Sequence, residues 1–169
     1  MFTIRPDDLS GEQTRQLLAL HVAAMRDGSP PGTSFALDLT GLASPDVTVW
    51  SAWDDDAIVG IGALKRHPDG TAELKSMRTH PDHLRRGVAA RLLEHIIQAA
   101  RASGARRLSL ETGDGPGFAA ALSLYTRRGF VEGETFGDYV PGAFNRFFHL
   151  DLRPLNPKAT RDPTMGMPE

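Results

Sequence analysis

A short segment rich in arginine and small residues, residues 84–90, has the composition of an anion-binding site. It lies between a predicted strand and a predicted helix. The first turn of a helix leaves several backbone N–H groups without intrahelical partners and carries about half a positive charge. Gly87 keeps that end free of bulk, and Arg85 and Arg86 add charge-assisted hydrogen bonds at its rim. The segment would suit a diphosphate, although a tight turn with two solvated arginines explains the same residues.

Three other groups of reactive or aromatic side chains have simpler explanations. His80–His83 holds two imidazoles and one carboxylate without further ligands, so we expect a loop and no metal site. The acidic run 54–56 is typical of a solvated turn. Trp50 and Trp53 are an odd number of residues apart on one predicted strand, so they point to opposite faces and cannot stack nucleic-acid bases together.

The overall charge argues against a surface that coats nucleic acid or a membrane. The chain of 169 residues has 19 Lys and Arg against 21 Asp and Glu, for a net charge of −2. Its basic residues are nearly all arginine, and many fall between Arg78 and Arg107. With no cysteine, a disulfide framework, a thiolate metal site and a cysteine nucleophile are excluded. The most apolar helical stretch, 17–25, is too short to span a bilayer, and no signal-peptide pattern is found, so we expect a cytoplasmic protein.

Hydrophobic periodicity predicts the elements that position these residues. Strands are expected at 2–5, 47–53, 57–64, 72–79, 107–112, 130–131 and 144–152, and helices from Ser10 (as N-cap) to Gly28, from Gly87 to Gly104, and over 118–128. The strands at 47–53, 57–64 and 72–79 form an antiparallel meander. The strand at 107–112 must lie parallel to the strand at 72–79, because a helix crosses over between them. We expect one domain over residues 1–152 and a disordered tail over 153–169.

Several segments resemble the GCN5-related N-acetyltransferase (GNAT) superfamily. They are residues 73–90, the strand end 110–112 and the motif 124–130 (Leu-Tyr-Thr-Arg-Arg-Gly-Phe). In finer detail, Glu73–Arg78, Leu110–Gly113 and Phe136–Tyr139 are similar to bacterial acetyltransferases of the YsnE type. The resemblance covers residues 2–152. It implies an α/β fold with a mixed, mostly antiparallel sheet of six to seven strands, a splayed parallel pair at its centre and helices on both faces.

The same resemblance implies acetyl-CoA as co-substrate, held without a metal. The backbone amides of residues 85–90 would hold the pyrophosphate, although Leu84 stands where the family usually carries Gln or Arg. The backbone of Met77 and Thr79 would pair with the pantetheine arm as an added strand would, and Phe118 would pack against that arm. The cofactor-binding residues expected on this basis are Met77, Arg78, Thr79, Leu84, Arg85, Arg86, Gly87, Val88, Ala89, Ala90, Phe118 and Tyr125.

Tyr125 stands where the family often carries a general acid. A phenol with a pKa near 10 stays protonated at neutral pH and can donate to a departing thiolate. The motif that surrounds Tyr125 favours this role. Packing between helix and sheet, with the hydroxyl on a backbone carbonyl, is the alternative.

Two carboxylates on the central strands, Glu73 and Glu111, are the candidate bases for an amine nucleophile. Burial would raise their pKa toward the useful range. Strict alternation would put Glu73, Lys75 and Met77 on one face of the strand and Arg78 on the other. We prefer Glu73 as base and keep Glu111 in reserve, or as a group that orients the amine. A structural salt bridge between Glu73 and Lys75 is the alternative.

The predicted function is therefore an acetyl-CoA-dependent N-acetyltransferase that acts on a primary amine of a small molecule or peptide by direct attack. The alternative is an acyl-CoA-binding sensor or regulatory module without turnover. Residues 28–33, 35–42 and 136–145 are expected to wall the acceptor site. Arg146 could pair with a substrate carboxylate or be an ordinary surface residue. The acceptor amine and the choice between monomer and homodimer stay open.

Overall fold

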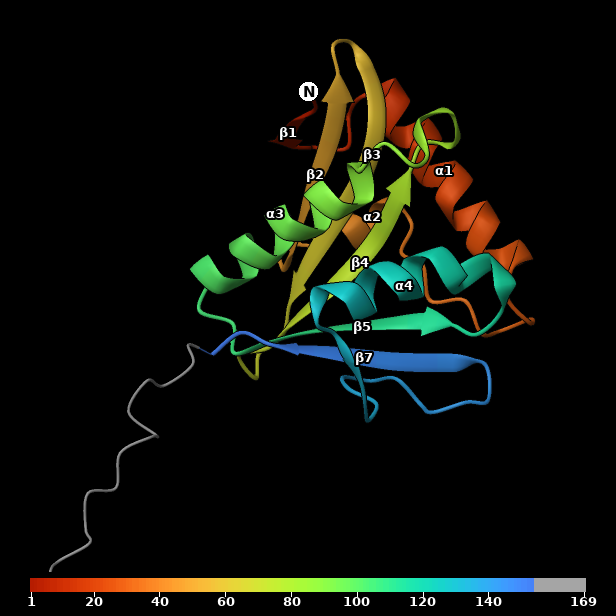
Figure 1. The fold of residues 1–169 in the computed structure, drawn as a ribbon, viewed down its shortest axis with the longest axis vertical. Coiled ribbons are helices and arrows are strands. Elements are labelled where there is room, and N and C mark those ends of the chain that lie inside the picture. Colours follow the sequence, from red (N-terminus) through yellow and green to blue (C-terminus); the bar gives the residue numbers. More distant parts are fainter. Residues whose placement is uncertain (154–169) are drawn as a thin grey trace, which may run out of the picture.

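The computed structural model describes residues 1–153, which form a single seven-stranded sheet with helices on both faces (Figure 1). The strand order is β1-β2-β3-β4-β5-β7-β6, and every neighbouring pair is antiparallel except β4 and β5. The strands are β1 (Thr3–Pro6), β2 (Val47–Asp54), β3 (Ala57–Arg66), β4 (Ala72–Thr79), β5 (Arg107–Gly113), β6 (Val131–Glu132) and β7 (Asn145–Asp151). The helices are α1 (Glu12–Asp27), α2 (Leu39–Leu42), α3 (Val88–Ala102) and α4 (Ala119–Arg128), with short 3-10 turns η1 (Pro81–His83) and η2 (Pro116–Phe118). The expected fold class is confirmed.

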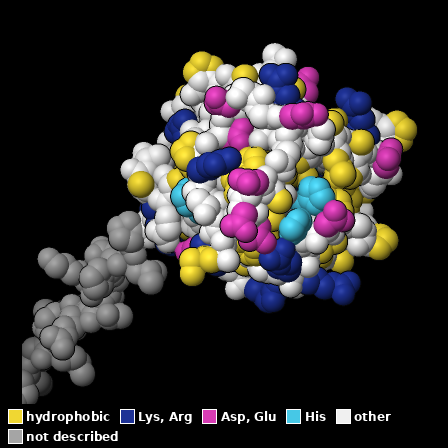
Figure 2. Space-filling view, turned by 90° about the horizontal axis from the view of Figure 1, so that it is seen from above, with side chains coloured by type: hydrophobic (Ala, Val, Ile, Leu, Met, Phe, Trp, Pro, Cys, Tyr) yellow, Lys and Arg dark blue, Asp and Glu magenta, His cyan; other side chains and the backbone are white. Residues whose placement is uncertain are grey.

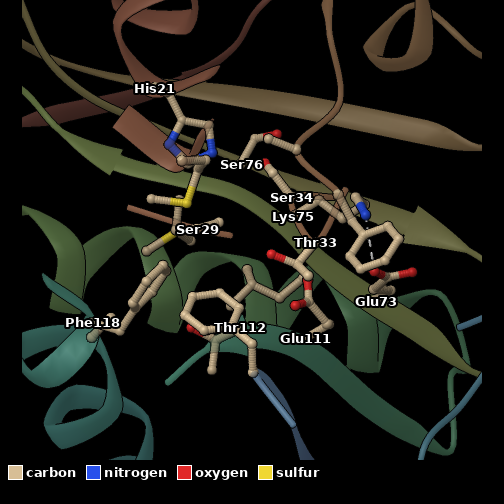
Figure 3. A pocket seen from close by; sticks show the side chains of 18 of the residues that line it. His21, Ser29, Thr33, Ser34, Glu73, Lys75, Ser76, Glu111, Thr112 and Phe118 are labelled. Atoms are coloured by element: carbon tan, nitrogen blue, oxygen red, sulfur yellow. Dashed lines mark hydrogen bonds and ion pairs between the residues drawn. The ribbon is translucent and has the colours of Figure 1, made fainter. Parts of the chain in front are cut away.

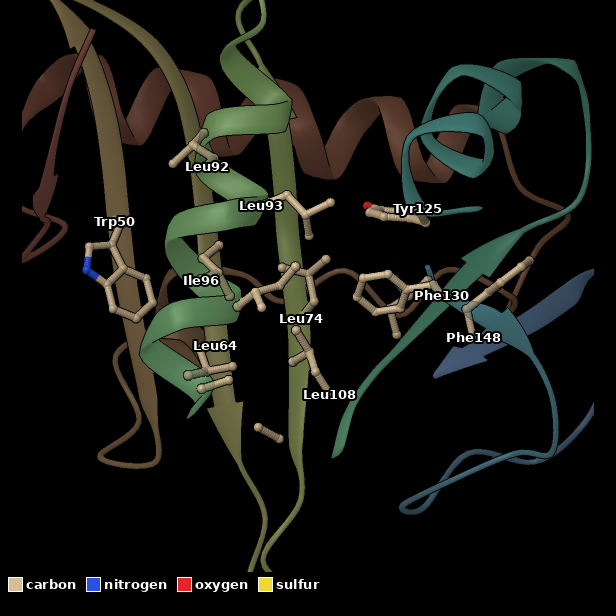
Figure 4. Close-up of a cluster of buried hydrophobic side chains, with 14 of the residues drawn as sticks. Trp50, Leu64, Leu74, Leu92, Leu93, Ile96, Leu108, Tyr125, Phe130 and Phe148 are labelled. Atoms are coloured by element: carbon tan, nitrogen blue, oxygen red, sulfur yellow. The ribbon is translucent and has the colours of Figure 1, made fainter. Parts of the chain in front are cut away.

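The sheet separates two hydrophobic cores. On one face, α3 and α4 pack with alternate residues of the central strands, among them Leu74 and Leu108, beneath Leu92 and Ile96 (Figure 4). On the other face, α1 and α2 cover a smaller cluster that includes Ile61. Figure 1 shows α3 and α4 in front of the sheet and α2 behind it. The sheet thus lies between two layers of helices, each of which covers its own hydrophobic cluster.

Two glycines of β3 let α3 lie close against the sheet. A Cβ atom on Gly60 would be 2.7 Å from Cγ1 of Val88, and one on Gly62 would be 2.7 Å from Cδ1 of Ile96. Side chains at these positions would therefore push α3 outward, because such distances are well inside van der Waals contact. Because Gly60 and Gly62 have no Cβ atoms, α3 can pack directly against the backbone of β3.

A β-bulge at Ser76 changes the side-chain pattern of β4. Opposite β3, Ala63 pairs with Lys75 and Ile61 with Arg78, so two residues of β4 face one residue of β3. Ser76 itself has φ of 56°, in the left-handed region. The predicted strict alternation is therefore wrong beyond Lys75. Met77 packs on the α3 side, and Arg78 points to the α1 side with Lys75.

The central parallel pair separates soon after it begins. β4 and β5 are paired at Ala72 with Leu108 and at Glu73 with Ser109, and no further pairs follow toward their carboxyl ends. The backbone of β4 from Leu74 onward therefore has an open edge on the β5 side. This confirms the splayed pair that the resemblance implied.

The N-cap of α1 differs from the predicted one. Ser10 is not the N-cap of α1; the cap is Gly11, and the Ser10 hydroxyl instead donates to Asp8 at 2.6 Å. The predicted disordered tail falls mainly on residues 154–169, which lie outside the described residues. Within residues 1–153, none of the helices is long and apolar enough to cross a bilayer.

Candidate active site

A pocket of about 110 Å³ lies where β4 and β5 separate (Figure 3). Its walls come from four parts of the chain. They are α1 and the following loop (His21, Met25, Ser29, Thr33, Ser34, Phe35, Ala36), β4 (Glu73, Leu74, Lys75, Ser76, Met77), β5 (Glu111, Thr112, Gly113), and the region of α4 with the loop before β7 (Phe118, Ala121, Tyr125, Phe144). All three predicted acid–base residues, Glu73, Glu111 and Tyr125, therefore line one pocket. Of the predicted cofactor residues, Met77, Phe118 and Tyr125 do so as well.

The remaining predicted cofactor residues lie outside the lining of this pocket. They follow β4 toward the start of α3 and are Arg78, Thr79, Leu84, Arg85, Arg86, Gly87, Val88, Ala89 and Ala90. α3 begins at Val88, and Gly87 caps it with φ of 80°, a conformation that suits glycine. A Cβ at Gly87 would meet nothing within 4 Å, so the space beside these first amides is open. The geometry fits an anion bound at a helix N-terminus.

The two arginines of this turn differ in their surroundings. Arg86 donates to Asp54 at 2.9 Å, contacts Nδ1 of His83 at 2.6 Å and lies over the ring of Phe2. Arg85 is exposed, with φ of 60°, and Leu84 is 58% exposed. Figure 2, which views this end of the molecule from above, shows Lys and Arg mixed with Asp and Glu. Several of the Lys and Arg side chains lie next to one another along the lower edge of that view, and others are separated by acidic and uncharged side chains.

Tyr125 is buried in the core on the α3 side, with its ring packed against Phe130. Figure 4 shows its hydroxyl directed toward β4. Burial raises the pKa of Tyr125 to about 12, an effect that the nearby charge of Arg78 opposes. The phenol is thus fully protonated at neutral pH and lies at the wall of the pocket.

Glu73 is already fully engaged by its neighbours. One carboxylate oxygen accepts from Tyr139 at 2.5 Å and from Lys75 at 3.1 Å, and the other lies 3.1 Å from Nε2 of His67. Lys75 also donates to the Tyr139 hydroxyl at 2.7 Å. Burial, together with the adjacent Glu73 charge, raises the pKa of Tyr139 above its ordinary value. These contacts connect β4 to the loop 136–144 and occupy both carboxylate oxygens of Glu73.

Glu111 has fewer hydrogen-bond partners than Glu73. It accepts from the side chain of Asn145 at 2.7 Å. Burial raises the pKa of Glu111, while the bond from Asn145 and the charge of Lys75 oppose that rise. Glu111 faces the same side of the sheet as Glu73 but carries no direct ion pair among residues 1–153.

Two further polar residues of the pocket wall, His21 and Ser76, were not among the predicted site residues. His21, on α1, is buried and accepts from Nε of Arg78 at 3.0 Å. Burial, and to a lesser degree the Arg78 charge, lowers the pKa of His21 to about 4, so it is neutral at physiological pH. Ser76 has a buried hydroxyl without a partner in the described part of the chain. A histidine within the apolar stretch 17–25 was the available signal.

The other candidate residues have ordinary partners. Phe118 packs edge-to-face on Phe144, with ring centroids 5.6 Å apart, and lines the pocket. Arg146 donates to Glu132 at 2.6 Å and lies 3.7 Å from Asp114, so its charge is already compensated. Within residues 1–153, no group of three or more His, Asp or Glu side chains is arranged to hold a metal ion.

A splayed parallel pair beside an exposed helix start, with Glu111 and Tyr125 lining the pocket between the strands, is the arrangement expected of an acyl-CoA-dependent acyltransferase. Residues 14–130 match the acetyltransferase (GNAT) family model, and the chain belongs to this family. It is 48% identical to YedL of Escherichia coli K12, an uncharacterized N-acetyltransferase, over 90% of this chain and 96% of that protein. It is 46% identical to YsnE of Bacillus subtilis 168, also an uncharacterized N-acetyltransferase, over 80% of this chain and 90% of that protein.

Solved structures agree on the fold. A Klebsiella pneumoniae protein assigned as an acyl-CoA N-acyltransferase has a TM-score of 0.76 at 27% identity, covering 90% of this chain and 99% of that one. A Bacillus subtilis acetyltransferase in complex with CoA has a TM-score of 0.67 at 18% identity, covering 89% and 99%. At 18% identity this second similarity supports the fold alone, and the bound CoA belongs to the Bacillus subtilis structure.

Proposed function

We propose that residues 1–152 form the catalytic domain of an acetyl-CoA-dependent N-acetyltransferase that acetylates a primary amine of a small molecule or peptide. The observation that carries the proposal is the pocket between β4 and β5, with Glu111 and Tyr125 in its walls and the start of α3 beyond its β4 side. The free edge of β4 suits the pantetheine arm, because amide groups can pair with an unpaired strand edge. The open amides at residues 85–90 suit the pyrophosphate.

Within this proposal, Glu111 is the base. The three side chains around Glu73 already use both of its oxygens, whereas Glu111 has a single amide donor. Its raised pKa improves its basicity, which favours it as the group that accepts the amine proton. We therefore reverse the preference that the sequence suggested. Glu73 acts in positioning, through Lys75 and Tyr139.

The reaction then needs no acyl-enzyme, and the chain has no cysteine to form one. The nitrogen of the neutral amine forms a bond to the thioester carbonyl carbon, Glu111 accepts the proton that this nitrogen then carries, and the carbon–sulfur bond breaks. Tyr125 donates a hydrogen bond to the departing thiolate. Because an ordinary thiol has a pKa of about 8.5 and Tyr125 one of about 12, stabilisation by this hydrogen bond is favoured over complete proton transfer. The thiolate leaves as the thiol after taking up, through solvent, the proton that Glu111 accepted.

The proposal is tested by thiol release from acetyl-CoA with a panel of amino acids, polyamines, aminoglycosides and peptide N-termini. We expect turnover with at least one class and none without an amine. Tight binding of acetyl-CoA with no thiol release across the whole panel would favour the sensor instead. We also propose a cytoplasmic location, supported by the cysteine-free composition and by the intracellular supply that a CoA thioester requires.

A further inference from the structure

The pocket wall on the α1 side contains polar groups that the proposed chemistry does not use. Ser76 is 8% exposed, and its hydroxyl has no hydrogen-bond partner among residues 1–153. His21 is 5% exposed and bonds to Arg78 through Nδ1 alone. Figure 3 shows both on the side of the pocket opposite Glu111 and Phe118. A buried donor without a partner costs about 1–3 kcal/mol, so a ligand that satisfies it gains binding energy.

The hydrogen bond from Arg78 determines which nitrogen of His21 carries the proton. A guanidinium can only donate, so Nδ1 of His21 must accept and the ring proton lies on Nε2. Nε2 has no acceptor within the described residues. The pocket therefore presents two donors, the N–H of His21 and the hydroxyl of Ser76, that call for an oxygen of the ligand.

The adjacent charge favours an anionic oxygen. Arg78 is half-buried and has no carboxylate partner within residues 1–153. Lys75, the other cation on this side, is already paired with Glu73 at 3.1 Å. A carboxylate beside His21 would thus receive two hydrogen bonds and the field of an uncompensated guanidinium, which is worth more in a partly buried site than in water.

The position of these groups separates them from the cofactor. α3, whose first turn would hold the pyrophosphate, covers the face of the sheet opposite α1. A CoA thioester would therefore reach the slot from the α3 side, and the wall formed by α1 and the loop 29–36 is left for the second substrate. The small pocket suits a compact acceptor better than a folded peptide segment.

We propose that the acceptor is a small amine that also carries a carboxylate, as an amino acid does, and that His21 and Ser76, backed by Arg78, bind this carboxylate. The inference rests on the proposed function and adds the acceptor class to it. The carboxylate is held on the α1 side and directs the amine across the pocket toward Glu111.

The test uses acceptor triplets that differ in one group: alanine, alaninamide and ethylamine, and methionine, methioninamide and 3-methylthiopropylamine. Thiol release gives kcat/KM for each, corrected for the fraction of unprotonated amine. We expect the amino acid to exceed both partners at least tenfold. His21→Leu and Ser76→Ala should raise the KM of the amino acid and shrink that ratio toward one, whereas His21→Gln, which can still accept from Arg78 and donate, should retain part of it. Ser123→Ala, an exposed serine of α4, is the matched control and should leave the ratio unchanged.

The possible outcomes separate the two proposals. Equal kcat/KM within each triplet would overturn the acceptor class while leaving the transferase function intact. A carboxylate preference that survives in His21→Leu and in both Ser76→Ala and Ser76→Gly would overturn the location. Ser76→Gly is included in case Ser76→Ala does not fold, because glycine adopts the positive φ at this position without strain. Absence of turnover with every amine would overturn the proposed function and this inference together.

Discussion

The two carboxylates of the pocket differ in what already surrounds them, and at the scale of single residues this difference should appear in the pH dependence of the reaction. A base must be ionised to accept the amine proton, so kcat/KM should fall as the pH drops through the pKa of Glu111, which burial raises above 4.5. Glu111→Gln should lower kcat roughly 10²- to 10⁴-fold and remove this acidic limb. The measurement is a pH profile of thiol release, with kcat/KM corrected at each pH for the fraction of unprotonated amine.

Glu73→Gln is the matched control for that profile. It keeps the size of the side chain and can still accept from Tyr139, but it leaves the charge of Lys75 uncompensated. We expect lower stability with the acidic limb retained. A profile that loses the limb in Glu73→Gln and keeps it in Glu111→Gln would return the base to Glu73.

Tyr125→Phe removes a hydroxyl from the pocket wall without removing the ring that packs on Phe130. Because the hydroxyl is proposed to bond to the thiolate only as it forms, kcat should fall roughly 10- to 150-fold, the equivalent of the 1.5–3 kcal/mol that a bond to a charged group contributes. The Kd for acetyl-CoA should change little. A thioester whose thiol is more acidic should be less sensitive to the substitution. Equal losses for both leaving groups would contradict the role.

At the scale of elements, the packing of α3 against β3 determines the position of residues 85–90, the turn that we propose binds the pyrophosphate. Gly60→Ala would place a Cβ 2.7 Å from Val88 and 2.9 Å from Leu92, so the helix must move. We expect a loss of about 1–3 kcal/mol in the free energy of unfolding, and weaker acetyl-CoA binding. Adding Val88→Ala to Gly60→Ala should recover part of both. Gly117→Ala, where a Cβ meets nothing within 4 Å, is the control, and urea unfolding with CoA titration are the measurements.

The elements themselves follow from local pattern, but the site depends on contacts between distant residues. Periodicity located every strand and the three long helices, because those signals lie within a few neighbouring residues. The resemblance implied a β-bulge beside the splayed pair, but position 76 is a serine, with no glycine to mark a positive φ. The place of the bulge, and with it the facing of Met77 and Arg78, therefore did not follow from the local pattern. The pairing of His21 with Arg78 and of Glu73 with Tyr139 depends on how α1 and the loop 136–144 pack against β4.

At the scale of the whole molecule, the two faces of the sheet carry different parts of the proposed site. The α3 side carries Tyr125 and the turn that we propose binds the pyrophosphate, and the α1 side carries both carboxylates, Lys75 and His21. The two sides meet where β4 and β5 separate. In the proposed reaction, cofactor and acceptor would therefore approach from opposite faces, and neither would have to leave before the other binds.

Burying a neutral histidine at this junction makes the stability of the whole fold sensitive to acid. His21 has a pKa of about 4 when folded and an ordinary value near 6.5 when unfolded, so between these values the unfolded chain binds the extra proton. Stability should therefore fall as the pH is lowered from 6.5 to 4, with His21 contributing about 3 kcal/mol of the loss. His21→Gln cannot titrate, so its unfolding free energy from urea melts at pH 7, 6, 5 and 4.5 should decline less steeply. Parallel curves for the two proteins would show that His21 is not the group responsible.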